Sequence, residues 1–179
     1  MFCSIRCWRW NSLCRVEDCI RLIKSGADKV VINTHAIKNP NLIKEASLLL
    51  GSQSVVIHIE AKKHQNWWEC YTDCGRIPSG LDVLSWTKEV EILGAGEIVI
   101  SSVDRDGLQQ GFDIELVKAV CDIVSIPVVA ASGVGNIQHI FDLLEKVEPS
   151  AIAIASALHY GNLDIQFIKS VLRDKGYIK

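Results

Sequence analysis

The run Asp104–Gly107 places two carboxylates and a glycine directly after the apolar, β-branched segment Glu97–Ser102. A buried strand that ends in an acidic, glycine-bearing loop is how parallel α/β enzymes present polar groups at their active face. Asp106 offers a proton-transfer group, and Gly107 lets backbone N–H groups approach a phosphate closely. Two interpretations stay open: a general acid/base beside a phosphate contact, or a turn in which an aspartate caps the next helix.

A second carboxylate, Glu60, ends another apolar segment, Ser54–Glu60. Two carboxylates at separate strand ends can divide the acid and base roles between them. The three histidines His58, His64 and His139 do not have the spacing of metal ligands. We therefore predict that they are structural or solvent-exposed.

Backbone and hydroxyl groups that suit an anion follow three other apolar segments. Gly133 lies in the glycine-bearing turn after one segment, and Ser156 ends the last one. Glycines in such turns let N–H groups approach an anion, and the following helix N-terminus adds favourable potential. Ser156 is equally consistent with an ordinary helix cap. Asn33 and Thr34 end the first readable strand and predict a second anion site, so that the substrate would be an elongated bisphosphate.

Lys29 and Glu97 stand at the opposite, N-terminal ends of their predicted strands. From the residues alone we interpret them as a salt bridge at the bottom of the sheet. Asp113 directly precedes the apolar-periodic stretch that begins at Ile114, and we predict that it caps that helix.

Apolar segments without polar alternation predict buried parallel strands, and amphipathic stretches between them predict helices. The strands are expected at Lys29–Asn33, Ser54–Glu60, Glu97–Ser102, Ile126–Ala131 and Ala151–Ser156. The helices are expected at Val16–Ser25, Pro40–Leu50, Leu81–Leu93, Ile114–Val124, Ile137–Val147 and Asp164–Lys175. The irregular insert Lys62–Gly80 predicts a hairpin or a lid.

Regular alternation of strands and helices indicates βαβ units, which allow an open doubly wound sheet or part of a closed barrel. The first strand-helix turn has no glycine-rich dinucleotide motif, which weakens the doubly wound interpretation. Polar residues at the ends of several strands favour a (β/α)8 TIM-type barrel. A whole barrel takes about 250 residues, so this chain is expected to be an incomplete one.

Composition narrows the class of protein. The chain has 179 residues and a formal net charge of -2, with 49% hydrophobic residues. This balance suits a compact domain and argues against a nucleic-acid-binding face or a membrane span. The seven cysteines have irregular spacings and predict the reduced thiols of a cytoplasmic protein.

The order of these motifs resembles the cyclase subunit of imidazole glycerol phosphate synthase. The segment Gly26–Thr34 is similar to that family's fourth strand, and Gly94–Val99 with the following acidic loop to its sixth. The turn at Gly133 is similar to its seventh strand, and Ala155-Ser156 with His159 to its eighth. The likeness extends from about Val16 to the C-terminus.

The resemblance implies a (β/α)8 barrel lacking roughly the first two to three βα units. It implies a lyase of histidine synthesis, which takes ammonia from a glutaminase partner to cleave and cyclise a bisphosphorylated aminoimidazole carboxamide ribonucleotide precursor. Asp106 would be the general acid/base and Glu60 its partner, while Lys29 and Glu97 would belong to an ammonia gate. No cofactor, metal, nucleic acid or membrane is implied. The phosphate-binding residues would be Asn33 and Thr34 on one side and Asp106, Gly107, Gly133 and Ser156 on the other.

Departures from the family pattern leave alternatives open. Glu60 stands where the family has an aspartate, and the family's first-strand aspartate lies in a region that this chain lacks. These features suggest a paralogous branch that amidates a sugar in surface polysaccharide synthesis. A further alternative is a non-catalytic subunit that activates a glutaminase.

The segment 1–15 has no strand or helix pattern, and we treat residues 16–179 as the partial barrel domain. Codons for residues 6–12, read one base later, can spell a glycine-rich sequence of the kind that the family carries there. We therefore hypothesise that a frameshift and an internal start produced this N-terminus.

Overall fold

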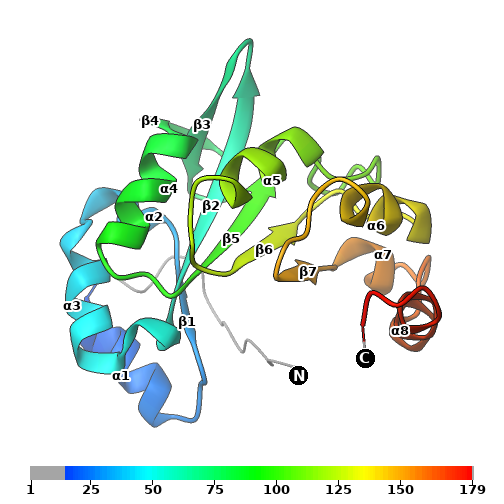
Figure 1. Ribbon diagram of the computed structural model, residues 1–179. Coiled ribbons are helices and arrows are strands. Elements are labelled where there is room, and N and C mark those ends of the chain that lie inside the picture. The colour runs from blue at the N-terminus through cyan, green and yellow to red at the C-terminus, as the bar shows by residue number, and fades with distance from the viewer. Residues whose placement is uncertain (1–14, 179) are drawn as a thin grey trace.

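The computed structural model describes residues 15–178 and shows a mixed α/β fold around one seven-stranded sheet (Figure 1). The strands are β1 (Val30–Ile32), β2 (Val55–His64), β3 (Trp67–Thr72), β4 (Ile77–Asp82), β5 (Glu97–Ser102), β6 (Val128–Ala131) and β7 (Ala151–Ala153). The helices are α1 (Val16–Lys24), α2 (Thr34–Lys38), α3 (Asn41–Leu50), α4 (Val83–Ile92), α5 (Ile114–Cys121), α6 (Ile137–Leu144), α7 (Ser156–His159) and α8 (Ile165–Asp174). A short 3₁₀ turn, Ser52–Ser54, precedes β2.

Five strands, β1, β2, β5, β6 and β7, run parallel and follow one another across the sheet. Each is reached from the previous one through at least one helix, as parallel pairing requires. The five strands predicted from the sequence are therefore all present. Strands β1, β6 and β7 are shorter than predicted, and Ser156 begins helix α7 instead of ending β7.

Strand β2 is the longest, and three neighbours share its edges. Its first residues pair with β1, and the stretch Val56–Ala61 pairs with β5 on the other side. Its outer half, Glu60–His64, pairs antiparallel with β3, which continues into β4. The insert predicted as a hairpin or a lid is therefore a hairpin that extends the sheet beyond the parallel strands (Figure 1).

The hairpin turn is built from consecutive residues in the left-handed region, with φ of 52° at Asp73, 61° at Cys74 and 71° at Gly75. Only glycine adopts this region without steric cost. The turn therefore keeps a strained backbone, which tertiary contacts have to support. Those contacts lie at the candidate site described below.

The hydrophobic core lies between the parallel strands and the helices. Alternate residues of β2 and β5, among them Ile57, Ile59 and Ile98, are fully buried in it together with Leu143 and Ile140 of α6. Figure 1 shows the helices along the outside of a curved sheet. The other side of the sheet, which we call the inner face, is thus left to the remaining alternate residues of each strand.

Within the described residues the sheet is open, since β1 pairs with β2 at one side and β7 with β6 at the other. None of the helices in residues 15–178 is long and apolar enough to cross a membrane. The predicted N-terminal segment 1–15 lies, apart from Arg15, outside the described residues.

Candidate functional site

Alternate residues of each strand point to the inner face, and several of them are polar. In β2 the residues Val56, His58 and Glu60 point away from the helices, since their neighbours Ile57 and Ile59 pack in the core. Residues in parallel register share a face. Glu97 therefore lies beside Val56, and Ser101 lies beside Glu60.

Glu60 is the centre of the hydrogen bonding at the carboxyl end of the inner face. It is only 9% exposed. Its Oε2 accepts a hydrogen bond from Asn33 Nδ2 at 2.6 Å and another from the Gly75 N–H at 3.1 Å. The strained hairpin turn is thus fastened onto this carboxylate, and so is the end of β1.

The pKa of Glu60 is raised, and burial is the largest cause. The hydrogen bonds from Asn33 and from the Gly75 N–H oppose this rise by stabilising the ionised form. The negative charges of Asp106 and Asp73 add to it. Asp106 and Glu60 are therefore close enough to influence each other, although they follow different strands.

Thr34 lies next to this cluster and is buried. Its Oγ1 accepts a hydrogen bond from the Asp73 N–H at 3.0 Å. Asn33, Thr34 and Glu60 are thus brought together at one end of β1 and β2, as the strand-end argument predicted. The sequence analysis did not identify the backbone N–H groups of Asp73 and Gly75 as part of the site. The Asp-Cys-Gly sequence, which is typical of a turn, was the signal that could have indicated them.

The acidic loop after β5 divides into residues with different surroundings. Asp104 Oδ2 accepts a hydrogen bond from the Lys63 N–H at 2.8 Å, so Asp104 ties the loop to β2. Asp113 Oδ1 accepts from the Leu116 N–H at 3.1 Å and caps α5, as predicted. Asp106 and Gly107 are exposed, and Gly107 has φ 72° with open space around it. Asp106 and Gly107 are therefore accessible from solvent, as are Leu108 and Gln110 of the same loop.

The glycine turn after β6 packs closely against the β5–α5 loop. The Gly111 N–H donates to the Gly133 carbonyl at 2.7 Å. A Cβ on Gly133 would lie 2.2 Å from the Gly111 carbonyl oxygen, so this position requires glycine for close approach. Ser132 Oγ accepts from the Ser102 N–H at 2.9 Å and joins the two loops further.

Ser156 begins α7 directly after β7 and is half-buried. Gly107, Gly133 and Ser156 thus follow β5, β6 and β7, which are neighbours in the sheet. The carboxyl ends of parallel strands lie at one edge, so these residues share the edge that holds Glu60 and Asp106. Asn33 and Thr34 stand across β2 from them.

Lys29 and Glu97 form an ion pair at the opposite end of the inner face, as predicted. Their side chains are 25% and 13% exposed. Because β1 and β5 flank β2 on either side, this ion pair spans the beginning of β2. The inner face therefore has an ion pair at one end and two carboxylates at the other.

A cleft of about 840 Å³ lies between the β2–β3 hairpin, the β5–α5 loop and the start of α5. Its lining includes Lys63 and Glu115, which form an ion pair at 2.5 Å, and the tethering residue Asp104. Trp68 Nε1 also donates to Asp113 Oδ2 at 3.1 Å in this region. These contacts hold the hairpin against α5.

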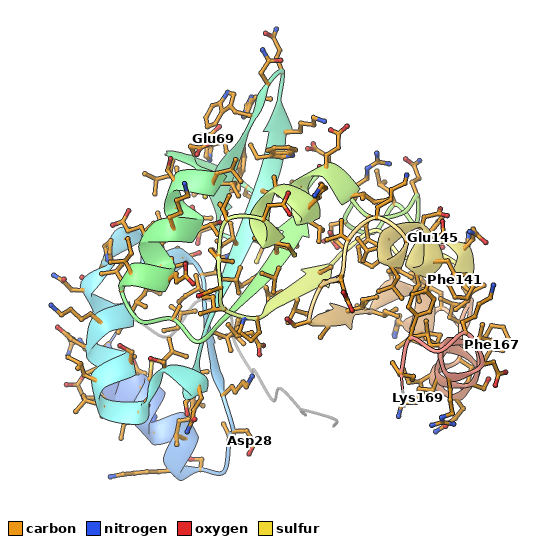
Figure 2. All side chains as sticks on the ribbon, in the orientation of Figure 1. Asp28, Glu69, Phe141, Glu145, Phe167 and Lys169 are labelled. Carbon is orange, nitrogen blue, oxygen red and sulfur yellow. The ribbon has the colours of Figure 1, made fainter. Side chains whose placement is uncertain are left out.

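The described residues contain no cluster of His, Cys, Asp and Glu that could hold a metal ion. Figure 2 labels three carboxylates, Asp28, Glu69 and Glu145, and Glu69 on the hairpin lies well apart from the other two. Glu69 accepts from the Gly80 N–H at 2.8 Å and pairs with His64 at 2.8 Å, so it stabilises the hairpin. The sequence-based interpretation of His64 as structural agrees with this contact.

Comparison with known proteins places this geometry in a family. The model of the family described as "Histidine biosynthesis protein" matches residues 13–164. The chain belongs to this family. Among its curated relatives, the protein named imidazole glycerol phosphate synthase subunit HisF from Thermococcus onnurineus is 46% identical over 161 residues. That from Pyrococcus furiosus is 47% identical over 161 residues.

Each alignment covers 90% of this chain and 64% of the relative. The chain therefore spans less than two thirds of the length of these relatives. The resemblance drawn from the strand-end motifs is confirmed at the level of the family. The roles of the individual residues are matters for the proposal that follows.

Proposed function

We propose that this chain carries the cyclase chemistry of imidazole glycerol phosphate synthase, as a lyase that uses ammonia on a bisphosphorylated aminoimidazole carboxamide ribonucleotide precursor. The observation that carries the proposal is the placement of two carboxylates at one edge of the sheet, Glu60 near the end of the parallel part of β2 and Asp106 in the loop after the neighbouring strand β5. Ring closure and cleavage both need protons to be moved at defined atoms, and a carboxylate pair with different surroundings supplies an acid and a base.

The two carboxylates differ in burial, as an acid and a base in one site are expected to do. Burial raises the pKa of Glu60, which favours its protonated form as an acid. Asp106 is exposed on its loop and can reach a bound substrate from above the strand ends. We assign Asp106 as the general acid/base and Glu60 as its partner.

The anion-binding groups lie on both sides of this pair. Gly107, Gly133 and Ser156 follow β5, β6 and β7, and backbone N–H groups at such turns suit a phosphate. Asn33 and Thr34 lie at the other side, near β1. A substrate with phosphates at both ends would then place its middle over Glu60 and Asp106.

The fold proposal follows from the same arrangement. Parallel strands with helices outside and polar groups at their carboxyl ends are the pattern of a (β/α)8 barrel. In the described residues β1 and β7 are the outer members of the parallel set. We propose that the sheet is part of such a barrel and that further βα units would close it.

The partner would be a glutaminase subunit docked at the end of the inner face that holds Lys29 and Glu97. The relatives are themselves named as synthase subunits. Large apolar side chains are exposed at the C-terminal ends of α3 and α4, namely Leu48 at 76%, Leu49 at 62% and Ile92 at 83%. Exposed apolar groups of this kind suit a protein interface. Ammonia would enter past the Lys29–Glu97 ion pair, which would act as a gate.

Steady-state turnover of the chain with the ribonucleotide precursor and ammonium salts tests the proposal. We expect Asp106→Asn to reduce kcat by at least about 100-fold, which is the usual contribution of an acid/base group. Glu45→Gln is the matched control, since Glu45 is an exposed carboxylate on α3 outside the site. Equal activity of both variants would refute the assignment of Asp106.

Assays with a glutaminase and with a sugar acceptor separate the two alternatives that the glutamate at position 60 leaves open. Stimulation of a glutaminase without turnover of the ribonucleotide would favour a non-catalytic activating subunit. Ammonia-dependent amidation of a sugar, without cyclisation, would favour the paralogous branch. Either result would replace the cyclase proposal.

A further inference from the structure

The inner face carries a buried polar pair that the proposed acid/base and phosphate roles do not use. His58 is 6% exposed, and its Nε2 lies 2.8 Å from Ser101 Oγ. The neighbouring inward positions are the valines Val31, Val56 and Val99. Burying a polar group among apolar ones costs stability unless hydrogen bonds compensate. The hydrogen bond to Ser101 therefore holds the imidazole on a stretch of this face that is otherwise apolar among the described residues.

The position of the pair along the inner face is defined by the register. His58 lies beside Val99, between the level of Glu97 and the level of Glu60. It precedes Glu60 on the same strand and the same face, about 7 Å away along β2. Ser101 is the register partner of Glu60. The hydrogen bond between His58 and Ser101 therefore joins the middle of the inner face to the level of the carboxylate.

The surroundings of His58 disfavour positive charge. Burial lowers the pKa of its imidazole to about 4, so the ring is neutral near neutral pH. Within residues 15–178, the charged groups that share this face are Glu60 on β2 and the ion pair between Lys29, just before β1, and Glu97 on β5, whose charges compensate each other. The same desolvation would disfavour ammonium, whereas neutral ammonia loses far less hydration.

We propose that His58 and Ser101 form a relay point that holds ammonia in its neutral form between the Lys29–Glu97 ion pair and Glu60. This inference rests on the proposed use of ammonia and specifies how the nitrogen is handled inside the sheet. A neutral imidazole has one donor and one acceptor nitrogen, and a hydroxyl both donates and accepts. The pair can therefore hydrogen-bond ammonia without a change of protonation and without forming a covalent bond. His58 is in this sense a positioning residue.

The direct test is nuclear magnetic resonance of the full chain labelled with ¹⁵N-histidine. Ammonium chloride is added well above the pKa of ammonium, and the same total concentration is added well below it, with sodium chloride as the salt control. We expect the ring ¹⁵N signals of His58 to shift only where free ammonia is present. The exposed His159 ring on α7 should stay unchanged. No shift at His58, or equal shifts with ammonium and ammonia, would overturn the proposal.

Two variants assign and control the signal. His58→Gln removes the ring resonance and identifies it. Ser101→Ala leaves the ring in place but removes its partner, so the response of His58 to ammonia should weaken by about fivefold, the usual effect of one hydrogen bond. An undiminished response in Ser101→Ala would overturn the part of the proposal that concerns the pair, and this variant remains informative if His58→Gln does not fold.

Turnover with ammonium salts supplies a second measurement. In His58→Ala we expect the KM for ammonia to rise about fivefold while the KM for the ribonucleotide is unchanged, and His58→Gln should recover part of the loss. A rise in both KM values would indicate a merely structural role. If the wild-type chain shows no turnover, the proposed function fails, whereas the magnetic resonance result still decides whether the inner face binds ammonia.

Discussion

The buried imidazole of His58 makes a quantitative prediction about stability in acid. Its pKa falls from 6.5 to about 4 on folding because burial penalises the charged form. Below 6.5 the unfolded chain therefore binds a proton that the folded chain does not, and stability is lost as the pH falls toward 4. At about 1.36 kcal/mol for each pKa unit, the loss from this group is about 2 kcal/mol at pH 5 and about 3 kcal/mol at pH 4.

Glu60 acts in the opposite direction over part of the same range. Its pKa is raised in the folded chain, so its contribution is present below the unfolded value near 4.5 and is lost as the pH rises through the folded value. The pH dependence of the wild-type chain alone would mix these effects. The difference between the wild type and His58→Gln isolates the imidazole, because Glu60 is present in both.

The assay is urea unfolding followed by far-ultraviolet circular dichroism at about pH 7 and about pH 5. The wild type should lose about 2 kcal/mol more than His58→Gln over this interval. His159→Gln removes an exposed histidine and should follow the wild type. Parallel curves for the wild type and His58→Gln would refute the reasoning, because they would mean that His58 titrates normally in the folded chain.

Three further predictions concern packing, thiols and the ion pair. Gly133→Ala should destabilise by at least about 2 kcal/mol, since its Cβ would meet the Gly111 carbonyl oxygen, while Gly107→Ala, with open space around it, should lose only about 1 kcal/mol; urea unfolding measures both. Exposed Cys74 should be alkylated by iodoacetamide in the native chain, whereas Cys70, whose pKa burial raises to about 12, should react only after unfolding, as peptide mass mapping would show. Lys29→Met should leave Glu97 unpaired and lower the free energy of unfolding by about 1–3 kcal/mol, measured by urea unfolding. A urea midpoint equal to that of the wild type would contradict this.

Local features were the ones that the sequence predicted well. The Asp113 cap depends on a side chain and a backbone N–H three residues away, and it is present. Strand β5 has the predicted bounds because its apolar residues are contiguous and its ends carry polar groups. The helices α2 and α7 were missed, since a helix of one turn has too few residues to show a periodic pattern.

Contacts between distant segments could not be predicted in the same way. The polar residues Lys62 and Lys63 indicated that β2 ends before them. In the structure β2 extends to His64, because its last residues pair antiparallel with β3. His58 was expected to be structural or exposed, and only the alternation with Val56 and Glu60 places it on the inner face. Which strand pairs with which is a property of the whole sheet, and single segments do not contain it.

The two hydrogen bonds to Glu60 come from different segments of the chain, the end of β1 and the turn between β3 and β4. Asn33 and the Gly75 N–H both stabilise the ionised carboxylate, and both bonds end on Oε2. If a substrate phosphate draws the Asn33 amide away from Glu60, the carboxylate loses one of its two donors and the pKa of Glu60 rises further. Binding at the β1 end would then favour protonation of Glu60, so that an acid is prepared beside Asp106 when the substrate arrives.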